Sequence, residues 1–216
     1  MLCRASILSL AAAFACATRP PPDPATSAVS VEGVPVADGA TWVRLHLFLR
    51  DAEGRPFAGS DVRWDASGSS NKLVVESART DSFGEASALL QSTAAEEKVV
   101  TAMVEELQVT RRLRFAAGPP AGTSTLRADP QSAPADGASA AVLVFRVRDS
   151  HGNAVAFAPV TVQVVSGVAS IGVRRESWRT DERGVFATSV RSTQAGRVQV
   201  QLRCGQVALL ATLSFY

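Results

Sequence analysis

Cysteine is scarce in this sequence. The chain has three cysteines, and two of them, Cys3 and Cys16, lie within its first 16 residues. Cys204 is thereby left without a partner, which excludes a framework of disulfide bonds. The alternation of apolar residues puts Cys204 on the inward side of a strand, so we expect a buried, unreactive thiol. A disulfide from Cys16 to Cys204 or to another chain remains an alternative if Cys16 carries no lipid.

Histidine is equally sparse, and the charge is nearly balanced. His46 and His151 are the only histidines, and neither lies in a cluster of cysteine, histidine and carboxylate ligands, which argues against a metal site. No set of residues offers both a nucleophile and a base, so we expect neither an enzyme nor a cofactor. The net charge is +2 without a basic stripe interleaved with aromatics, which argues against nucleic-acid binding.

The first 28 residues read as an export signal and a tether. Arg4 precedes an apolar run to Ala15 that is too short to span a bilayer, and Cys16 follows directly. Residues 1–15 resemble a bacterial lipoprotein signal, which would make Cys16 the lipid attachment site and the membrane a partner. Residues 16–28 contain four prolines and predict a semi-rigid tether. We expect a cell-envelope protein, an outer-membrane lipoprotein facing the periplasm or the surface; a secreted or periplasmic protein is the alternative.

The remaining sequence is a tandem repeat. The tripeptide Ala-Asp-Gly at 37–39 returns 98 residues later at 135–137, and the pattern Thr-Asp-x-x-Gly at 80–84 returns 100 residues later at 180–184. A nearly constant offset predicts two copies of one fold. We assign a first domain to 29–116, a linker with two prolines to 117–122, and a second domain to 123–216.

Both copies predict strands throughout. Val43, Leu45, Leu47 and Leu49 alternate with bulkier or polar residues, which is typical of a half-buried strand. The same alternation places Val62, Trp64, Leu73 and Val75 inward. Short strands with a turn every 8 to 12 residues favour an all-β fold made of two antiparallel β-sandwiches.

Aspartate and glycine mark the turns between these strands. The pairs are Asp51 with Gly54, Asp81 with Gly84, Asp149 with Gly152, and Asp181 with Gly184. A carboxylate at the first position can accept bonds from the following amides, and glycine tolerates a left-handed backbone at the fourth. We interpret these residues as structural; a calcium site is the alternative, although calcium needs six to eight oxygen ligands.

Two surfaces could bind a partner. Trp42, Phe83 and Trp178 could form an exposed aromatic surface for a glycan or a protein. Four arginines could contact an anionic polymer or simply form a solvated face: Arg174, Arg175, Arg179 and Arg183.

The recurring motifs resemble the bacterial immunoglobulin-like domain, group 1, found as repeats in invasin- and intimin-type adhesins. They are the Ala-Asp-Gly tripeptides, the strands that end at 50–54 and 148–152, the Thr-Asp-x-x-Gly turns, and Ser-Thr at 92–93 and 192–193. The resemblance implies two immunoglobulin-like sandwiches that act as a non-enzymatic, adhesin-like spacer or interaction module with an unknown protein or glycan partner. The alternatives are a periplasmic accessory subunit that docks through a sheet edge, and a carbohydrate-binding module.

Overall fold

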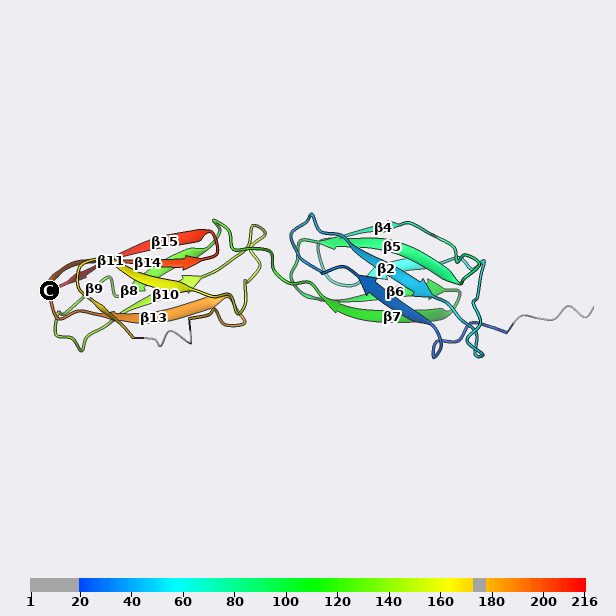
Figure 1. Ribbon diagram of the computed structural model, residues 1–216, viewed down its shortest axis with the longest axis horizontal. Coiled ribbons are helices and arrows are strands. Elements are labelled where there is room, and N and C mark those ends of the chain that lie inside the picture. Colours follow the sequence, from blue (N-terminus) through cyan, green and yellow to red (C-terminus); the bar gives the residue numbers. More distant parts are fainter. Residues whose placement is uncertain (1–19, 173–177) are drawn as a thin grey trace, which may run out of the picture.

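The chain forms two β-sandwiches that follow one another end to end (Figure 1). The computed structural model describes residues 20–172 and 178–216. Every regular element among these residues is a β-strand, so the all-β prediction is confirmed. The signal peptide, Cys16, Arg174 and Arg175 lie outside the described residues.

The first domain contains seven strands in two facing sheets. They are β1 (Ala28–Glu32), β2 (Val43–Phe48), β3 (Arg63–Ala66), β4 (Asn71–Val75), β5 (Glu85–Ser92), β6 (Glu97–Val104) and β7 (Leu107–Arg114). One sheet has the order β1-β2-β5-β4 and the other has the order β3-β6-β7, with every pair antiparallel.

The second domain has the same two-sheet arrangement, with one additional short strand. Its strands are β8 (Thr125–Asp129), the additional β9 (Ser132–Ala133), β10 (Ala141–Arg146), β11 (Thr161–Ser166), β12 (Ser170–Ile171), β13 (Val185–Arg191), β14 (Gly196–Cys204) and β15 (Val207–Phe215). The sheets have the orders β12-β13-β10-β8 and β11-β14-β15-β9. Only the short pairing of β15 with β9 is parallel among these.

Each sandwich has its own hydrophobic core, built from the inward side of its strands. In β2, Val43, Leu45 and Leu47 are fully buried while Arg44 is exposed, as the period of two requires. Cys204 is also buried, with 1% of its surface exposed. Burial raises the pKa of its thiol, which fits an unreactive side chain.

One predicted core residue is on the surface. Val75 lies opposite the buried Ala88 and therefore keeps the inward phase, yet it is 44% exposed. Its strand, β4, is the edge of a four-stranded sheet that faces a sheet of three strands. Leu73, on the same face of β4, packs against the core, but Val75 is the last residue of the strand and is left uncovered, so the prediction that Val75 belongs to the core is wrong.

The end of the predicted tether is attached to the first domain. The backbone N–H of Asp23 donates to the carbonyl of Arg50 at 2.8 Å, and Thr26 Oγ1 donates to the carbonyl of Asp51 at 2.7 Å. Among the described residues, no helix is long and apolar enough to cross a bilayer.

Candidate functional site

Residues of both domains form a network of hydrogen bonds at the junction between them. The N–H of Ala37 donates to the carbonyl of Ala116 at 2.8 Å, which fixes the end of the first domain. The N–H of Ala121 donates to the carbonyl of Arg148 at 2.7 Å, which fixes the start of the second. Only residues 117–120 cross between these two anchors, and they include Pro119 and Pro120. Proline fixes the backbone φ angle, so the crossing is short and stiff.

Asp149 is the centre of the junction. Its side chain is buried, and Oδ1 accepts bonds from the N–H groups of His151 and Asn153, both at 2.9 Å. Oδ2 accepts the N–H of Gly118 in the linker at 2.9 Å and Asn153 Nδ2 at 2.8 Å. Burial by itself would raise the pKa of Asp149, but these hydrogen bonds outweigh it and hold the pKa below its usual value. The carboxylate therefore ties the linker to the first turn of the second domain.

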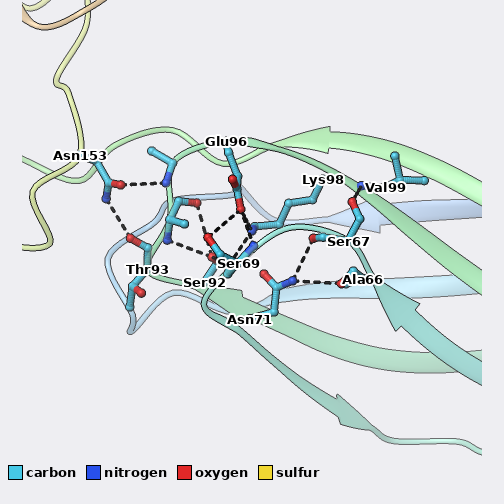
Figure 2. A network of polar contacts seen from close by, with 12 residues as sticks. Ala66, Ser67, Ser69, Asn71, Ser92, Thr93, Glu96, Lys98, Val99 and Asn153 are labelled. Carbon is cyan, nitrogen blue, oxygen red and sulfur yellow. Dashed lines mark hydrogen bonds and ion pairs between the residues drawn. The ribbon is translucent and has the colours of Figure 1, made fainter.

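Asn153 reaches from that turn into the first domain. Its Nδ2 donates to the carbonyl of Thr93 at 2.9 Å, and its Oδ1 accepts the N–H of Ala95 at 3.0 Å. Figure 2 shows Asn153 pointing at the loop that carries Thr93. One amide side chain thus pairs with a donor and an acceptor of the neighbouring domain, which fixes direction as well as distance.

His151 makes a second contact across the junction. Its Nε2 lies 2.9 Å from the carbonyl oxygen of Asp38. The Asp38 carboxylate accepts bonds from Thr41 N–H, Ala40 N–H and Thr41 Oγ1, which lower its pKa to about 2. These bonds shape the loop that presents the Asp38 carbonyl to His151.

A shallow groove runs along one side of the junction. It has a volume of about 430 Å³, and residues of both domains line it. Phe157 borders this groove with 59% of its surface exposed and a φ of 55°, where the equivalent residue of the first domain is Gly59. A bulky residue with a left-handed backbone is strained. The neighbouring alanines and valine are too small to cover its ring.

The predicted turn residues form the same hydrogen bonds in both domains. Asp51 Oδ1 accepts the N–H groups of Glu53 and Arg55, just as Asp149 Oδ1 accepts those of His151 and Asn153. Asp81 Oδ1 accepts the N–H groups of residues 83 and 85, and Asp181 Oδ1 those of 183 and 185. The four glycines have positive φ: Gly54, Gly84, Gly152 and Gly184.

These acids form no metal centre in the part of the chain that the structure describes. No group of three or more histidine, cysteine, aspartate or glutamate side chains there could hold a metal ion. His46 Nε2 lies 3.3 Å from Glu32 Oε2, and the His46 ring stacks on Phe48.

The aromatic residues do not come together as one surface. Trp42 is half-buried and has the Lys72 ammonium 5.3 Å from the centroid of its ring, so a cation already lies over that ring. Phe83 is 66% exposed in a turn of the first domain, whereas Trp178 is half-buried and packs against the core of its own domain, the second. Of the predicted arginine cluster, Arg179 donates to the carbonyl of Phe157 at 3.0 Å, and Arg183 is exposed.

Sequence reasoning missed the residues that join the domains. The sequence presents His151 only as a histidine outside any metal-ligand cluster, and it gives no separate reason to select Asn153. The available signal was the repeat itself, because these two positions change from charged residues in the first copy to His and Asn in the second.

Comparison with known proteins agrees with this architecture. The chain is similar in structure to InvD of Yersinia pseudotuberculosis, with a TM-score of 0.73, 18% identity, and coverage of 89% of this chain and 58% of that one. It is also similar to FdeC, an Escherichia coli adhesin, with a TM-score of 0.75, 16% identity, and coverage of 91% and 66%. The chain thus spans less than two thirds of either relative. At these identities the likeness shows the fold alone.

The sequence model of a single domain family matches twice, over residues 26–116 and again over 123–216. The two segments contain both sandwiches and both sides of the junction. The predicted family is confirmed: the chain belongs to the bacterial immunoglobulin-like domain (group 1) family, with two domains in tandem.

Proposed function

We propose that this protein is a non-enzymatic spacer of the cell envelope that presents its second domain at a fixed orientation, in the manner of an adhesin. The junction carries this proposal. Asn153, His151 and Asp149 connect the second domain to three separate segments of chain, namely the loop at Thr93, the loop at Asp38 and the linker. Domains joined only by a linker reorient by default, and hydrogen bonds to three separate segments oppose that motion, so in our proposal the two domains act as one rod.

The relatives support an adhesin-like role. FdeC is described as an adhesin, and this chain shares its fold over most of its own length. Adhesive proteins need a stiff element that keeps the binding surface away from the membrane. In our proposal the two sandwiches are that element, and a partner protein or glycan contacts the second domain.

A lipid at Cys16 holds the rod at the membrane in this proposal. The sequence of residues 1–16 supports the anchor, and attachment of Asp23 and Thr26 to the first domain leaves a short segment between lipid and rod. Acyl chains contribute about 0.8 kcal/mol for each buried methylene, so several chains on one cysteine anchor firmly.

Intact mass of the protein from the membrane fraction tests the anchor. The wild-type protein should lose 15 leading residues and gain diacylglyceryl and acyl mass, and Cys16→Ser should abolish both changes. A soluble product with an unmodified Cys16 would overturn the lipid anchor. Protease treatment of intact cells then reports whether the rod faces the outside.

Docking through a sheet edge is a second candidate, favoured by β11. This strand is at the edge of its sheet, and its sequence Thr-Val-Gln-Val-Val-Ser carries no charge. Val165 is 51% exposed and lies at an irregularity in the pairing of β11 with β14. Its counterpart β3 carries Arg63 and Asp65, and charged residues protect an edge from pairing. Val165→Lys should abolish capture of an envelope partner if β11 docks it, and unchanged capture would exclude this edge.

A further inference from the structure

Lys98 is a fully buried charged side chain, with 0% of its surface exposed, and it lies at the junction end of the first core. Its ammonium is 2.7 Å from Glu96 Oε1 and 2.9 Å from the carbonyl oxygen of Ser69, and 5.8 Å from the centroid of the Phe115 ring. Taking a charge out of water is costly even when it is paired, and an apolar pair of similar size is often as stable. Stability of the core therefore does not explain a lysine at this position.

The second domain shows that the fold does not need this ion pair. The residues equivalent to Glu96 and Lys98, 100 positions later, are Gly196 and Val198. Val198 is buried in the second core with 2% of its surface exposed. An apolar side chain at this position of the strand is therefore compatible with the fold.

The ion pair connects two loops of the first domain. Glu96 Oε1 also accepts the Ser69 N–H at 2.7 Å and the Ser69 hydroxyl at 3.2 Å. Beside it, the Thr93 N–H donates to the carbonyl of Ser70 at 3.3 Å. Figure 2 shows Glu96 and Lys98 converging on Ser69, with Ser92 and Thr93 close by. The loop at 67–70 is thereby attached to the loop at 92–96.

The loop at 92–96 is the one that receives the second domain. It supplies the Thr93 carbonyl and the Ala95 N–H to Asn153. We propose that Glu96 and Lys98 are positioning residues that hold this loop in the geometry Asn153 requires, and so set the orientation between the domains. This inference rests on the proposed spacer function and names the residues that make the spacer stiff.

The equivalent loop of the second domain supports this assignment. Ser192 shapes it as Ser92 shapes the first, since Ser192 Oγ donates to the carbonyl of Gln194 and accepts the Gln194 N–H. The turn therefore forms without an ion pair. The Glu96–Lys98 ion pair occurs in the first domain, whose loop contacts the second domain, and its counterpart positions in the second domain are Gly196 and Val198.

Residual dipolar couplings measured by NMR on the full chain test the proposal. They report whether two domains share one alignment tensor, and they report folding within each domain independently. The wild-type protein should give one tensor for both domains. The double variant E96G/K98V, which copies the second domain, should keep the internal couplings of each domain and lose the common tensor. Lys98→Met, which keeps the volume of the side chain, should also lose it.

Two controls make the result specific. Asn153→Ala should lose the common tensor, because it removes the contact itself. E97Q/R112Q removes an exposed ion pair between β6 and β7, in which Arg112 Nη1 lies 3.2 Å from Glu97 Oε1, and it should keep the common tensor. If both Lys98 variants keep one tensor while Asn153→Ala loses it, the positioning role of Glu96 and Lys98 is overturned and the spacer remains. If the wild type already gives two tensors, the spacer proposal and this inference both fail.

Discussion

Asn153 occupies in the second domain the position that Arg55 occupies in the first, and both side chains donate to Oδ2 of the preceding turn aspartate at 2.8 Å. Their remaining bonds differ. Arg55 turns back to Glu53 at 2.7 Å, whereas Asn153 extends across the junction to Thr93. The turn at 51–55 therefore makes these side-chain bonds within itself, whereas the equivalent turn at 149–153 also bonds to the other domain.

Asn153→Ala should release the domains from each other. The variant loses two hydrogen bonds across the junction, each contributing about 1 kcal/mol. Nitrogen-15 relaxation should give one rotational correlation time for both domains in the wild type and shorter, unequal times in the variant. Arg55→Ala is the matched control, because it changes the equivalent turn away from the junction. A correlation time in Asn153→Ala as long as that of the wild type would refute the role of this residue.

Acid should loosen the junction before it unfolds the cores. The pKa of Asp38 is lowered from 3.8 to about 2, and that of Asp149 is also below its usual value. A lowered pKa contributes stability that is present above the unfolded-state pKa and is lost as the pH falls through the folded-state pKa. The contact of His151 with the Asp38 loop should therefore weaken as the pH falls from about 4 towards 2, and the contacts of Asn153 should weaken as Asp149 is protonated at acid pH. The chemical shift of Asn153 Nδ2 should move with that of the Asp149 carboxyl carbon; an Asn153 shift that stays constant while the Asp149 carboxyl carbon titrates would contradict this.

Gly184→Ala should destabilise the second domain far more than Gly152→Ala. Both glycines have positive φ, but a Cβ on Gly184 would lie 2.6 Å from the Val147 carbonyl oxygen and 2.9 Å from the Val155 nitrogen. Nothing lies within 4 Å of a Cβ on Gly152. We expect a loss of about 1 kcal/mol at Gly152 from the strained backbone and about 3 kcal/mol at Gly184, where overpacking is added. Urea unfolding measures both, and equal losses would mean that the close approach at Gly184 is relieved by local movement.

Phe157→Gly should stabilise the second domain. The substitution removes a left-handed backbone strain from a side chain that is mostly exposed, and we expect a gain of about 1 kcal/mol in the free energy of unfolding. Gly59→Ala, at the equivalent position with a φ of 78°, should have the opposite sign in the first domain. A loss of stability in Phe157→Gly would instead indicate that the ring contributes to the junction groove.

The fold was predictable because its signals are local and occur twice. The alternation at Val43, Leu45 and Leu47 gave the inward face directly, and the repeat gave the number of domains. Val75 was wrongly assigned because its exposure depends on what packs against the end of β4, which no local pattern encodes.

The junction was harder to predict because its chemistry is tertiary. Asn153 pairs with backbone groups of Thr93 and Ala95, and any residue has such groups, so the sequence of the partner loop carries no sign of the contact. Lys98 follows the inward phase of Val100, but a charged side chain at that phase is ordinarily assigned to the surface. Comparing the two copies position by position is the route by which both residues could have been found.

Distances between spin labels at opposite ends of the protein test the central claim most directly. Gln108 and Arg197 are exposed, and each lies in a different domain. Spin labels are attached at Gln108→Cys and Arg197→Cys, with Cys3 and Cys16 replaced by serine. Pulsed electron–electron double resonance then measures the distance between the two labels. A domain pair fixed by Asn153, His151 and Asp149 gives a single narrow distance distribution, which broadens when Asn153→Ala is added. A broad distribution already present with Asn153 intact would contradict the account of a stiff two-domain rod.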